Sequence, residues 1–279
     1  PVEDCAESDS ESCAAAVVWD RKIPDSALST SYTLVSTKKE YLYMKLGIMQ
    51  PYFLPYLGYW QLIQCVDTFV IYDDVNFIKG GWINRNRYLY QNEAKTFNII
   101  MHDSSSFKKI NEIELMQPAG EYSPMKKLLS TFSMAYKKAQ HYPEISKLLE
   151  QITACQEKNM AKFIENSLRI ICAYLDISAK ILVSSDIEKT EGLVKEKRVL
   201  DLCKRMQADF YINAAGGKEL YRADEFLQNG ITLKFIKMNS IEYPQFGGEF
   251  VPNLSIVDVL MFNDKETVKK MLREYTLED

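Results

Sequence analysis

Short apolar runs alternate with segments of helical periodicity from Met44 onward. Five runs are typical of buried strands: KLGIMQ, TFVIYDD, KILVSS, DFYIN and ITLKFI. Helical spacing separates them, in YWQLIQCV, in KEKRVLDLCKRM and in the segment that ends at Leu227. Strands that alternate with helices predict an α/β fold with a mostly parallel sheet, flanking helices and right-handed βαβ connections.

Two other regions depart from this alternation. Residues 122–176 contain three segments with apolar residues at helical spacing, which predict a helical insertion. Before them, NRYLY and TFNIIM predict a hairpin whose strands are joined by the polar QNEAK. After the last predicted strand, we expect an irregular aromatic stretch, EYPQFGGEFVPNLS, and two short helices.

Residues 1–43 differ from the rest of the chain. The segment EDCAESDSES is acidic, rich in serine and poor in large apolar groups, which is typical of disorder. We interpret residues 1–43 as a disordered linker, a remnant of an upstream domain or a misplaced gene start, and we expect no chemistry there. Residues 44–279 are then the α/β domain.

Composition narrows the class of protein. Of the 279 residues, 47% are hydrophobic and 26% are charged, which is typical of a soluble globular protein of one or two domains. A net charge of -4 argues against a general nucleic-acid-binding surface or a membrane-surface binder. Without a membrane-spanning run or a signal peptide, the sequence predicts a cytoplasmic protein with no membrane insertion.

Metal and nucleophile chemistry are not indicated. The six cysteines form no CxxC pair and the chain has only two histidines, so we expect reduced, mostly buried thiols and no metal site. His102 and His141 are isolated, and no catalytic triad is visible. The chain also has no GxGxxG motif and no P-loop, so no cofactor can be named.

Polar clusters follow four of the predicted strands. In an open parallel sheet, ligands bind beyond the carboxyl ends of the strands, which share one edge. The clusters are Gln50 with the loop as far as Gly58, then Asp73 and Asp74, then Ser184 to Asp186, and finally Asn213 with Gly216 and Gly217. The topology therefore predicts that the candidate chemistry gathers at one edge.

Asp73 and Asp74 are the candidate catalytic residues. A carboxylate at a strand end serves as a general base, as a ligand of Mg²⁺, or as an acceptor for sugar hydroxyls or an amine. The alternative is that one of them only caps the next turn.

The loop PYFLPYLG, before a predicted helix, is a candidate anion site. Backbone N–H groups at a helix N-terminus point toward a bound anion. The alternative is that Pro51, Pro55 and Gly58 only shape a tight crossover, while Tyr52, Tyr56 and Tyr59 pack in the core.

The segment DDVNFIKGGWINRNR, residues 73–87, is unusually polar. In an extended conformation, Arg85 and Arg87 project to the same side, and paired guanidinium groups suit phosphate or carboxylate. Lys79 lies nearby in the sequence, and Trp82 offers a ring that stacks on a sugar or a base. The alternatives are a surface strand with solvated charges and a Trp82 that fills the core.

The segment NAAGGKELY is a predicted strand-to-helix turn. Gly216 and Gly217 are able to take positive φ and to let a ligand approach the backbone. A plain turn explains these glycines equally well.

Four segments together resemble the WbqC-like family of bacterial proteins: IMQPYFLPYLGYWQLI, VDTFVIYDDVNFIKGGWINRNR, ADFYINAAGGKELY and EFVPNLSIVDVLMFN. The resemblance covers residues 44–279. Members of this family are associated with clusters that build O-antigen and other surface polysaccharides. The resemblance implies a transferase that adds an amino acid such as glycine, or another acyl group, to an amino sugar. Some relatives carry a His where this chain has Met49, so a mechanism centred on that His is not expected here.

The resemblance assigns site residues by position. The family motifs fall on Gln50, Pro51, Tyr56, Gly58, Asp73, Asp74, Asn76, Lys79, Trp82, Asn84, Arg85, Asn86, Arg87, Gly216, Tyr221, Ser255 and Asp258. Asp73 and Asp74 are the predicted catalytic residues. The predicted substrate-binding residues are Gln50, Tyr52, Tyr56, Gly58, Asn76, Lys79, Trp82, Asn84, Arg85, Asn86, Arg87, Gly216, Gly217 and Tyr221.

The combined expectation is a Rossmann-like α/β transferase that acts on a nucleotide-linked or lipid-linked amino sugar. Arg85, Arg87 and Lys79 would hold its phosphate or carboxylate, while Trp82 and Tyr56 stack on the ring. An acyl or aminoacyl carrier is the expected partner. Two rivals stay open: a non-catalytic protein that binds a glycan or a partner enzyme, and an ATP-dependent ligase suggested by fold analogy.

Overall fold

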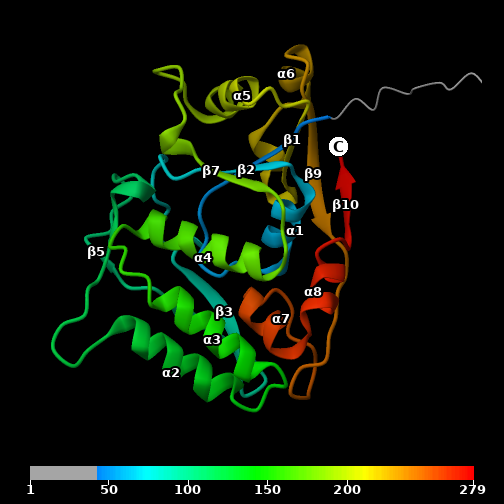
Figure 1. Cartoon of the computed structure of the whole chain (residues 1–279). Coiled ribbons are helices and arrows are strands. Elements are labelled where there is room, and N and C mark those ends of the chain that lie inside the picture. The colour runs from blue at the N-terminus through cyan, green and yellow to red at the C-terminus, as the bar shows by residue number, and fades with distance from the viewer. Residues whose placement is uncertain (1–42) are drawn as a thin grey trace, which may run out of the picture. The chain divides into compact units, whose positions relative to one another are not determined.

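The computed structural model describes residues 43–279, and the expectation for residues 1–43 lies almost wholly outside them. Its centre is a six-stranded sheet with the strand order β10-β9-β8-β1-β2-β7. The strands are β1 (Lys45–Met49), β2 (Thr68–Ile71), β7 (Lys180–Val183), β8 (Phe210–Ala214), β9 (Thr232–Met238) and β10 (Tyr275–Glu278). All pair in parallel except β10, which runs antiparallel to β9 (Figure 1). The predicted mostly parallel sheet is confirmed, whereas the edge strand β10 was not predicted.

Strand β1 lies at the centre of the parallel strands. The chain adds β2 and β7 on one side of β1 and then returns to add β8 and β9 on the other. The order reverses between β1 and β8, as it does in Rossmann-like sheets. All five parallel strands therefore present their carboxyl ends at the same edge.

Helices cover both faces of the sheet because the strand side chains alternate. Phe69 and Ile71 of β2 belong to the main core cluster, whereas Val70 between them belongs to a second cluster on the opposite face. The main cluster contains residues of α1 (Leu57–Cys65), α4 (Met160–Tyr174), α7 (Ile256–Phe262) and α8 (Lys265–Met271). The second contains residues of α5 (Lys195–Arg205) and α6 (Ala223–Gln228).

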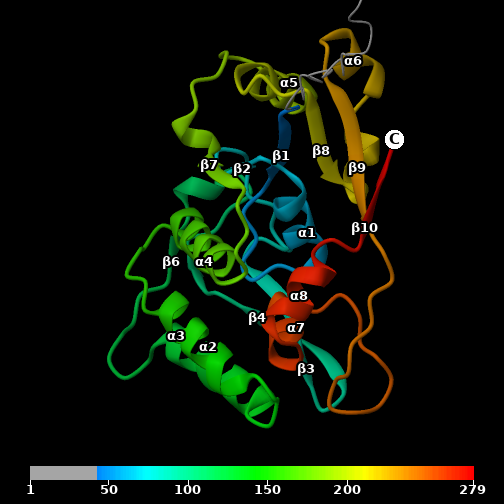
Figure 2. The same ribbon diagram turned by 45° about the vertical axis from the view of Figure 1, so that its right-hand side comes forward.

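The connection from β2 to β7 holds most of the remaining structure. It contains β3 (Arg85–Tyr90), β4 (Glu93–Asn98), the short pair β5 (Met101–His102) and β6 (Glu114–Leu115), α2 (Pro124–Tyr136), α3 (Tyr142–Thr153) and α4. The three predicted helices are thus present within residues 122–176. In both views α2, α3 and α7 lie at the lower end of the molecule, away from α5 and α6 at the top (Figures 1 and 2).

The loop of the hairpin is shorter than predicted. Strands β3 and β4 are joined by Gln91 and Asn92 alone, both with positive φ of 52° and 60°. The prediction that QNEAK forms the loop is wrong, because Glu93 and Lys95 belong to β4. That strand is exposed at all positions except Phe97, so its polar residues look like a loop in the sequence.

Among residues 43–279, no helix combines the length and apolarity needed to cross a membrane.

Candidate functional site

Five of the predicted binding residues line one pocket. Tyr52 and Tyr56 come from the loop after β1, Trp82 from the loop before β3, and Asn86 and Arg87 from β3 itself. With Asn253, they enclose a volume of about 320 Å³, which we call the Tyr–Arg pocket. This volume falls within the range of small-molecule sites.

Hydrogen bonds lock the walls of this pocket together. The N–H of Phe53 donates to the carbonyl of Ile83 at 2.8 Å. The carbonyl of Leu54 accepts from Nδ2 of Asn86 at 3.0 Å and from Oγ of Ser255 at 2.7 Å. Three segments that are distant in sequence are therefore held together. Asn86 both lines the cavity and joins two of these segments through its side-chain hydrogen bond.

Arg87 is the cation of the pocket. Its Nη2 donates to the carbonyl of Asn253 at 3.0 Å, while its Nε is buried and has no hydrogen-bond partner among the described residues. A buried donor without an acceptor costs about 1–3 kcal/mol. An oxyanion bound beside the guanidinium would supply the missing acceptor.

The tyrosines keep their protons. Burial raises the pKa of Tyr56, and burial together with the neighbouring Tyr56 raises that of Tyr52. Both hydroxyls therefore stay neutral near pH 7 and are able to donate hydrogen bonds. Trp82 is 46% exposed, so its ring is accessible, and the core-filling alternative for it is wrong.

Gly58 acts on the pocket through Tyr56. A Cβ at Gly58 would lie 2.6 Å from Cε2 of Tyr56, so only glycine lets the ring occupy its place. In the same loop, Tyr59 is buried in the core and its hydroxyl donates to the carbonyl of Gln50 at 2.8 Å. The packing alternative thus holds for Tyr59, whereas Tyr52 and Tyr56 line the pocket.

Arg85 and its neighbours lie outside the Tyr–Arg pocket. The Arg85 guanidinium donates to the carbonyls of Gly80 and Gly81 and lies 5.3 Å from the centre of the Trp82 ring. The remaining predicted residues of this segment are also placed elsewhere: Nδ2 of Asn76 donates to the carbonyl of Ser106, Nδ2 of Asn84 donates to that of Ile99, and Lys79 is exposed.

The two acids do not line the Tyr–Arg pocket either. Asp73 accepts hydrogen bonds from the N–H and the Oγ of Ser185, at 2.9 and 2.7 Å. It borders a hollow of about 220 Å³ together with Asn111 and Lys162. The predicted clusters after β2 and after β7 are therefore in direct contact.

Asp74 is held by cations. It accepts from Oγ of Ser184 at 2.7 Å and pairs with Nζ of Lys189 at 3.0 Å and with Arg198. Burial raises the pKa of Asp74, but the Ser184 hydrogen bond and the two cations outweigh burial, and the pKa is lowered. A carboxylate of lowered pKa is a weak proton acceptor near pH 7. Among residues 43–279, no group of His, Cys, Asp and Glu side chains is arranged to hold a metal ion.

Gly216, Gly217 and Tyr221 gather after β8. The glycines belong to a 3₁₀ helix, Ala215–Leu220, and neither has positive φ, so that expectation is wrong. A Cβ at Gly217 would lie 2.6 Å from Nδ2 of Asn213, so close approach, not backbone conformation, demands glycine there. The Tyr221 ring packs against Tyr211 and Phe226 in the second core cluster.

Ser255 and Asp258 support the site from α7. Ser255 caps this helix, and its N–H donates to the carbonyl of Arg87 at 2.8 Å. Asp258 is fully buried and accepts from the hydroxyls of Tyr136 and Tyr243 and from Nε2 of Gln245. Burial raises its pKa despite these three donors.

Asn253, Lys189 and Arg198 contact the candidate site residues but were not predicted from the sequence. Asn253 contributes through a backbone carbonyl and a φ of 55°, and neither has a distinct signal in one sequence. Arg198 looks like any basic residue of the polar helix α5. Only the fold brings it beside Asp74.

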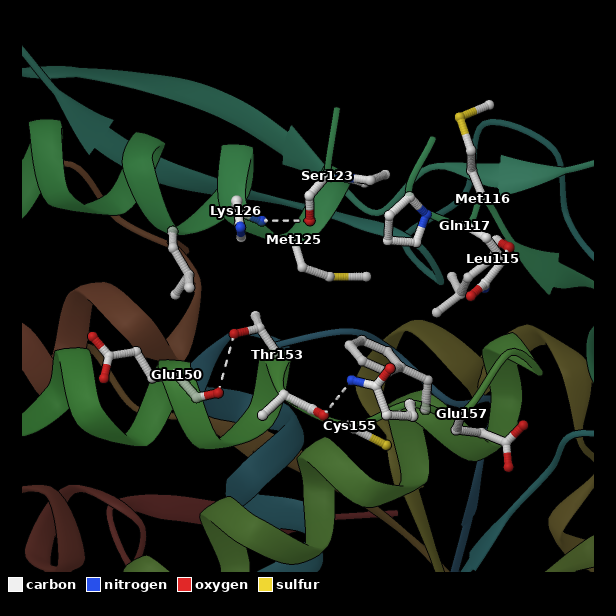
Figure 3. Close-up of a pocket in the computed structure, with 16 residues that line it drawn as sticks. Leu115, Met116, Gln117, Ser123, Met125, Lys126, Glu150, Thr153, Cys155 and Glu157 are labelled. Atoms are coloured by element: carbon white, nitrogen blue, oxygen red, sulfur yellow. Dashed lines mark hydrogen bonds between the residues drawn. The ribbon is translucent and has the colours of Figure 1, made fainter. Parts of the chain in front are cut away.

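Another hollow, of about 350 Å³, lies between the start of α2 and the end of α3 (Figure 3). Several of its polar side chains make local hydrogen bonds. Ser123 caps α2, and Oγ1 of Thr153 and Nε2 of Gln156 donate to nearby backbone carbonyls. None of its lining residues belongs to the predicted binding set, and we assign no function to it.

Comparison with known proteins gives a family but no activity. The chain is 29% identical over 222 residues to the uncharacterized protein Rv1507c of Mycobacterium tuberculosis, a match that covers 78% of this chain and 93% of that protein. No solved structure matches the chain significantly. Residues 50–270 match the model of the WbqC-like protein family. Since this match covers most of its length and includes every residue of the Tyr–Arg pocket, the chain belongs to the WbqC-like protein family.

Proposed function

We propose that this protein is an acyl or aminoacyl transferase, with glycine as one candidate group, and that it modifies an amino-sugar intermediate of bacterial surface polysaccharide. The observation that carries the proposal is the Tyr–Arg pocket, where Tyr52, Tyr56 and Trp82 line the same cavity as Arg87, whose Nε has no hydrogen-bond partner among the described residues. Aromatic faces with one cation suit a sugar ring that bears phosphate or carboxylate. The association of the family with O-antigen clusters supports the choice of pathway.

In this proposal the pocket residues have separate roles. Arg87 holds the phosphate or carboxylate of the sugar, and the neutral hydroxyls of Tyr52 and Tyr56 donate to its oxygen atoms. The exposed Trp82 ring stacks on the sugar. The acceptor is a nucleotide-linked or lipid-linked amino sugar, and the donor is an acyl or aminoacyl carrier.

The transfer step needs a proton acceptor. The amine nitrogen attacks the carbonyl carbon of the donor, a C–N bond forms, the bond to the carrier breaks, and the amine proton passes through a base to the leaving group. Asp73 remains the candidate base. Asp74 is less suited, because Lys189 and Arg198 already hold its carboxylate.

A non-catalytic binding protein is the second candidate. It is favoured by one observation: Asp73 and Asp74 border other hollows than the Tyr–Arg pocket, and both accept hydrogen bonds from serine side chains. In that case the pocket recognises the glycan intermediate without transforming it. The ATP-dependent ligase has only the Rossmann-like strand order in its favour.

Binding of a UDP-linked amino sugar, measured by isothermal titration calorimetry, tests the pocket. We expect Arg87→Gln to weaken binding at least tenfold, because a charge-assisted hydrogen bond contributes about 1.5–3 kcal/mol. Arg222→Gln is the control, since Arg222 is exposed, pairs with Glu225 at the surface and lies outside the pocket. Equal losses in both variants, or no loss in either, would contradict the assignment.

Turnover separates the transferase from the binding protein. Metabolite profiling of a strain that lacks the gene should show a glycan intermediate short of one acyl or aminoacyl group. With the intermediate and an activated acyl or aminoacyl donor, the unmodified protein should form the acylated product, whereas Asp73→Asn should bind the intermediate normally but form no product. If the deletion strain lacks no such group, the transferase proposal fails and the binding protein remains.

A further inference from the structure

A separate hollow of about 420 Å³ lies beyond the carboxyl ends of β2 and β7. It is lined by three basic residues, Lys109, Lys189 and Arg198, with Asn111 and Ser185, around the carboxylate of Asp74. We call it the basic hollow. It shares no lining residue with the Tyr–Arg pocket. The carboxyl edge of a parallel sheet is where ligands of such folds bind.

The outer wall of the basic hollow is fixed by α5. Asp201 of this helix accepts from the N–H and Oγ1 of Thr190, at 3.0 and 2.9 Å. Arg205 joins the same group, donating to Asp201 and to Oγ1 of Thr190. The loop that carries Lys189 is therefore held in place before any ligand arrives.

Positive charge exceeds negative charge in this hollow. Its three cations face two carboxylates, Asp74 and Glu191. Asp74 already forms ion pairs with Lys189 and Arg198. Lys109 is exposed and makes no ion pair with the described residues. Nε of Arg198 is buried without a hydrogen-bond partner among them.

We propose that the basic hollow binds the phosphate group of a phosphate or diphosphate ester, at a site distinct from the Tyr–Arg pocket. Arg198 supplies directed donors and Lys109 a mobile point charge at the rim. Asp74 works as a positioning residue that holds Arg198 and Lys189 at the hollow. The proposal does not depend on the transferase function, since it concerns binding alone.

Calorimetric titration of the full chain with inorganic pyrophosphate tests this site. We expect binding that weakens as salt rises, because exposed charges are screened. Arg198→Gln should weaken it about tenfold or more, by loss of a charged hydrogen bond. Lys109→Gln should weaken it about threefold, the size of an exposed charge pair. Lys95→Gln, which removes an exposed cation of β4 that lines neither cavity, should leave it unchanged.

A parallel titration with ADP identifies the source of the phosphate. Tighter binding of ADP than of pyrophosphate, with the same dependence on Arg198, indicates a nucleotide. Binding no tighter than that of pyrophosphate indicates that the phosphate alone is recognised, as on a phosphorylated carrier. Either result supports a phosphate site.

Three results would overturn the proposal. They are no binding of pyrophosphate by the unmodified protein at millimolar concentration, unchanged binding in both Arg198→Gln and Lys109→Gln, and a loss of binding in Lys95→Gln as large as that in Arg198→Gln. The exposed Lys109 side chain makes its variant safe for folding. Circular dichroism checks the fold of Arg198→Gln.

Discussion

Gly216 and Gly217 are neighbours in the sequence, yet their surroundings differ. A Cβ at Gly217 would meet Nδ2 of Asn213 at 2.6 Å, whereas one at Gly216 would have nothing within 4 Å. We therefore expect Gly217→Ala to lower the free energy of unfolding by about 1–3 kcal/mol, the usual cost of overpacking. Thermal melting, followed by circular dichroism, measures this change.

Gly216→Ala is the matched control, and it should melt at or slightly above the temperature of the unmodified protein. A similar loss in both variants would mean that backbone conformation, and not the close approach of Asn213, demands glycine here.

Asp74 gives a stability that depends on pH. Its pKa is lowered in the folded protein from an ordinary value of 3.8. The stabilisation is therefore fully present above that value and is lost as pH falls through the folded pKa. We expect Asp74→Asn to lower the free energy of unfolding at pH 7 by about 3 kcal/mol, because Lys189 and Arg198 lose their partner. The difference between the two proteins should shrink below about pH 4.

Denaturant unfolding at several pH values measures this difference. Asp176→Asn is a suitable control, since Asp176 pairs with Lys265 and Lys269 at the exposed surface and should contribute little. A difference between Asp74→Asn and the unmodified protein that stays constant from pH 7 to pH 3 would contradict the ionic role of Asp74.

At the level of elements, the β3–β4 hairpin carries unfavourable backbone angles at its tip. Gln91 and Asn92 both have positive φ, which suits Asn and Gly and opposes β-branched residues. Gln91→Val should therefore lower the free energy of unfolding by about 1–3 kcal/mol. Gln91→Asn should leave it unchanged or raise it slightly.

Thermal melting of the two Gln91 variants tests the turn geometry. The order of melting temperatures should be Asn at or above Gln, and Gln above Val. Equal melting of the Asn and Val variants would show that Gln91 does not hold the left-handed conformation in solution.

The sequence pattern predicts the buried elements well and the exposed ones poorly. Strands β1, β2, β7, β8 and β9 are apolar runs, so each was predicted close to its observed position. Strand β4 is exposed, and β10 is half exposed at the sheet edge, so neither has the apolar signal of a central strand. The edge position of β10 also depends on its pairing with β9, which a local pattern does not reveal.

At the scale of the whole molecule, the same limit applies to the candidate site. The shared carboxyl edge follows from a parallel sheet, and contacts between Asp73 and Ser185 bear this out. A parallel sheet does not predict that Asp74 and Arg87 line different cavities, because this depends on long-range contacts of each side chain. Asp74 accepts a hydrogen bond from Arg198, 124 residues away in the sequence, and Arg87 donates one to the carbonyl of Asn253, 166 residues away. A catalytic role for Asp73 stays a prediction.

The long connection between β2 and β7 has a consequence for how the chain acquires its structure. These two strands pair directly, although residues 72–179 lie between them in sequence. Closing such a loop is slow, since its entropy is lost before the contacts form. While the chain is being synthesised, β2 therefore presents an open edge until residue 183 has emerged, and β1 does so until β8 follows. Apolar, unpaired edges of this kind attract other chains, so this protein is expected to depend on chaperones more than its size suggests.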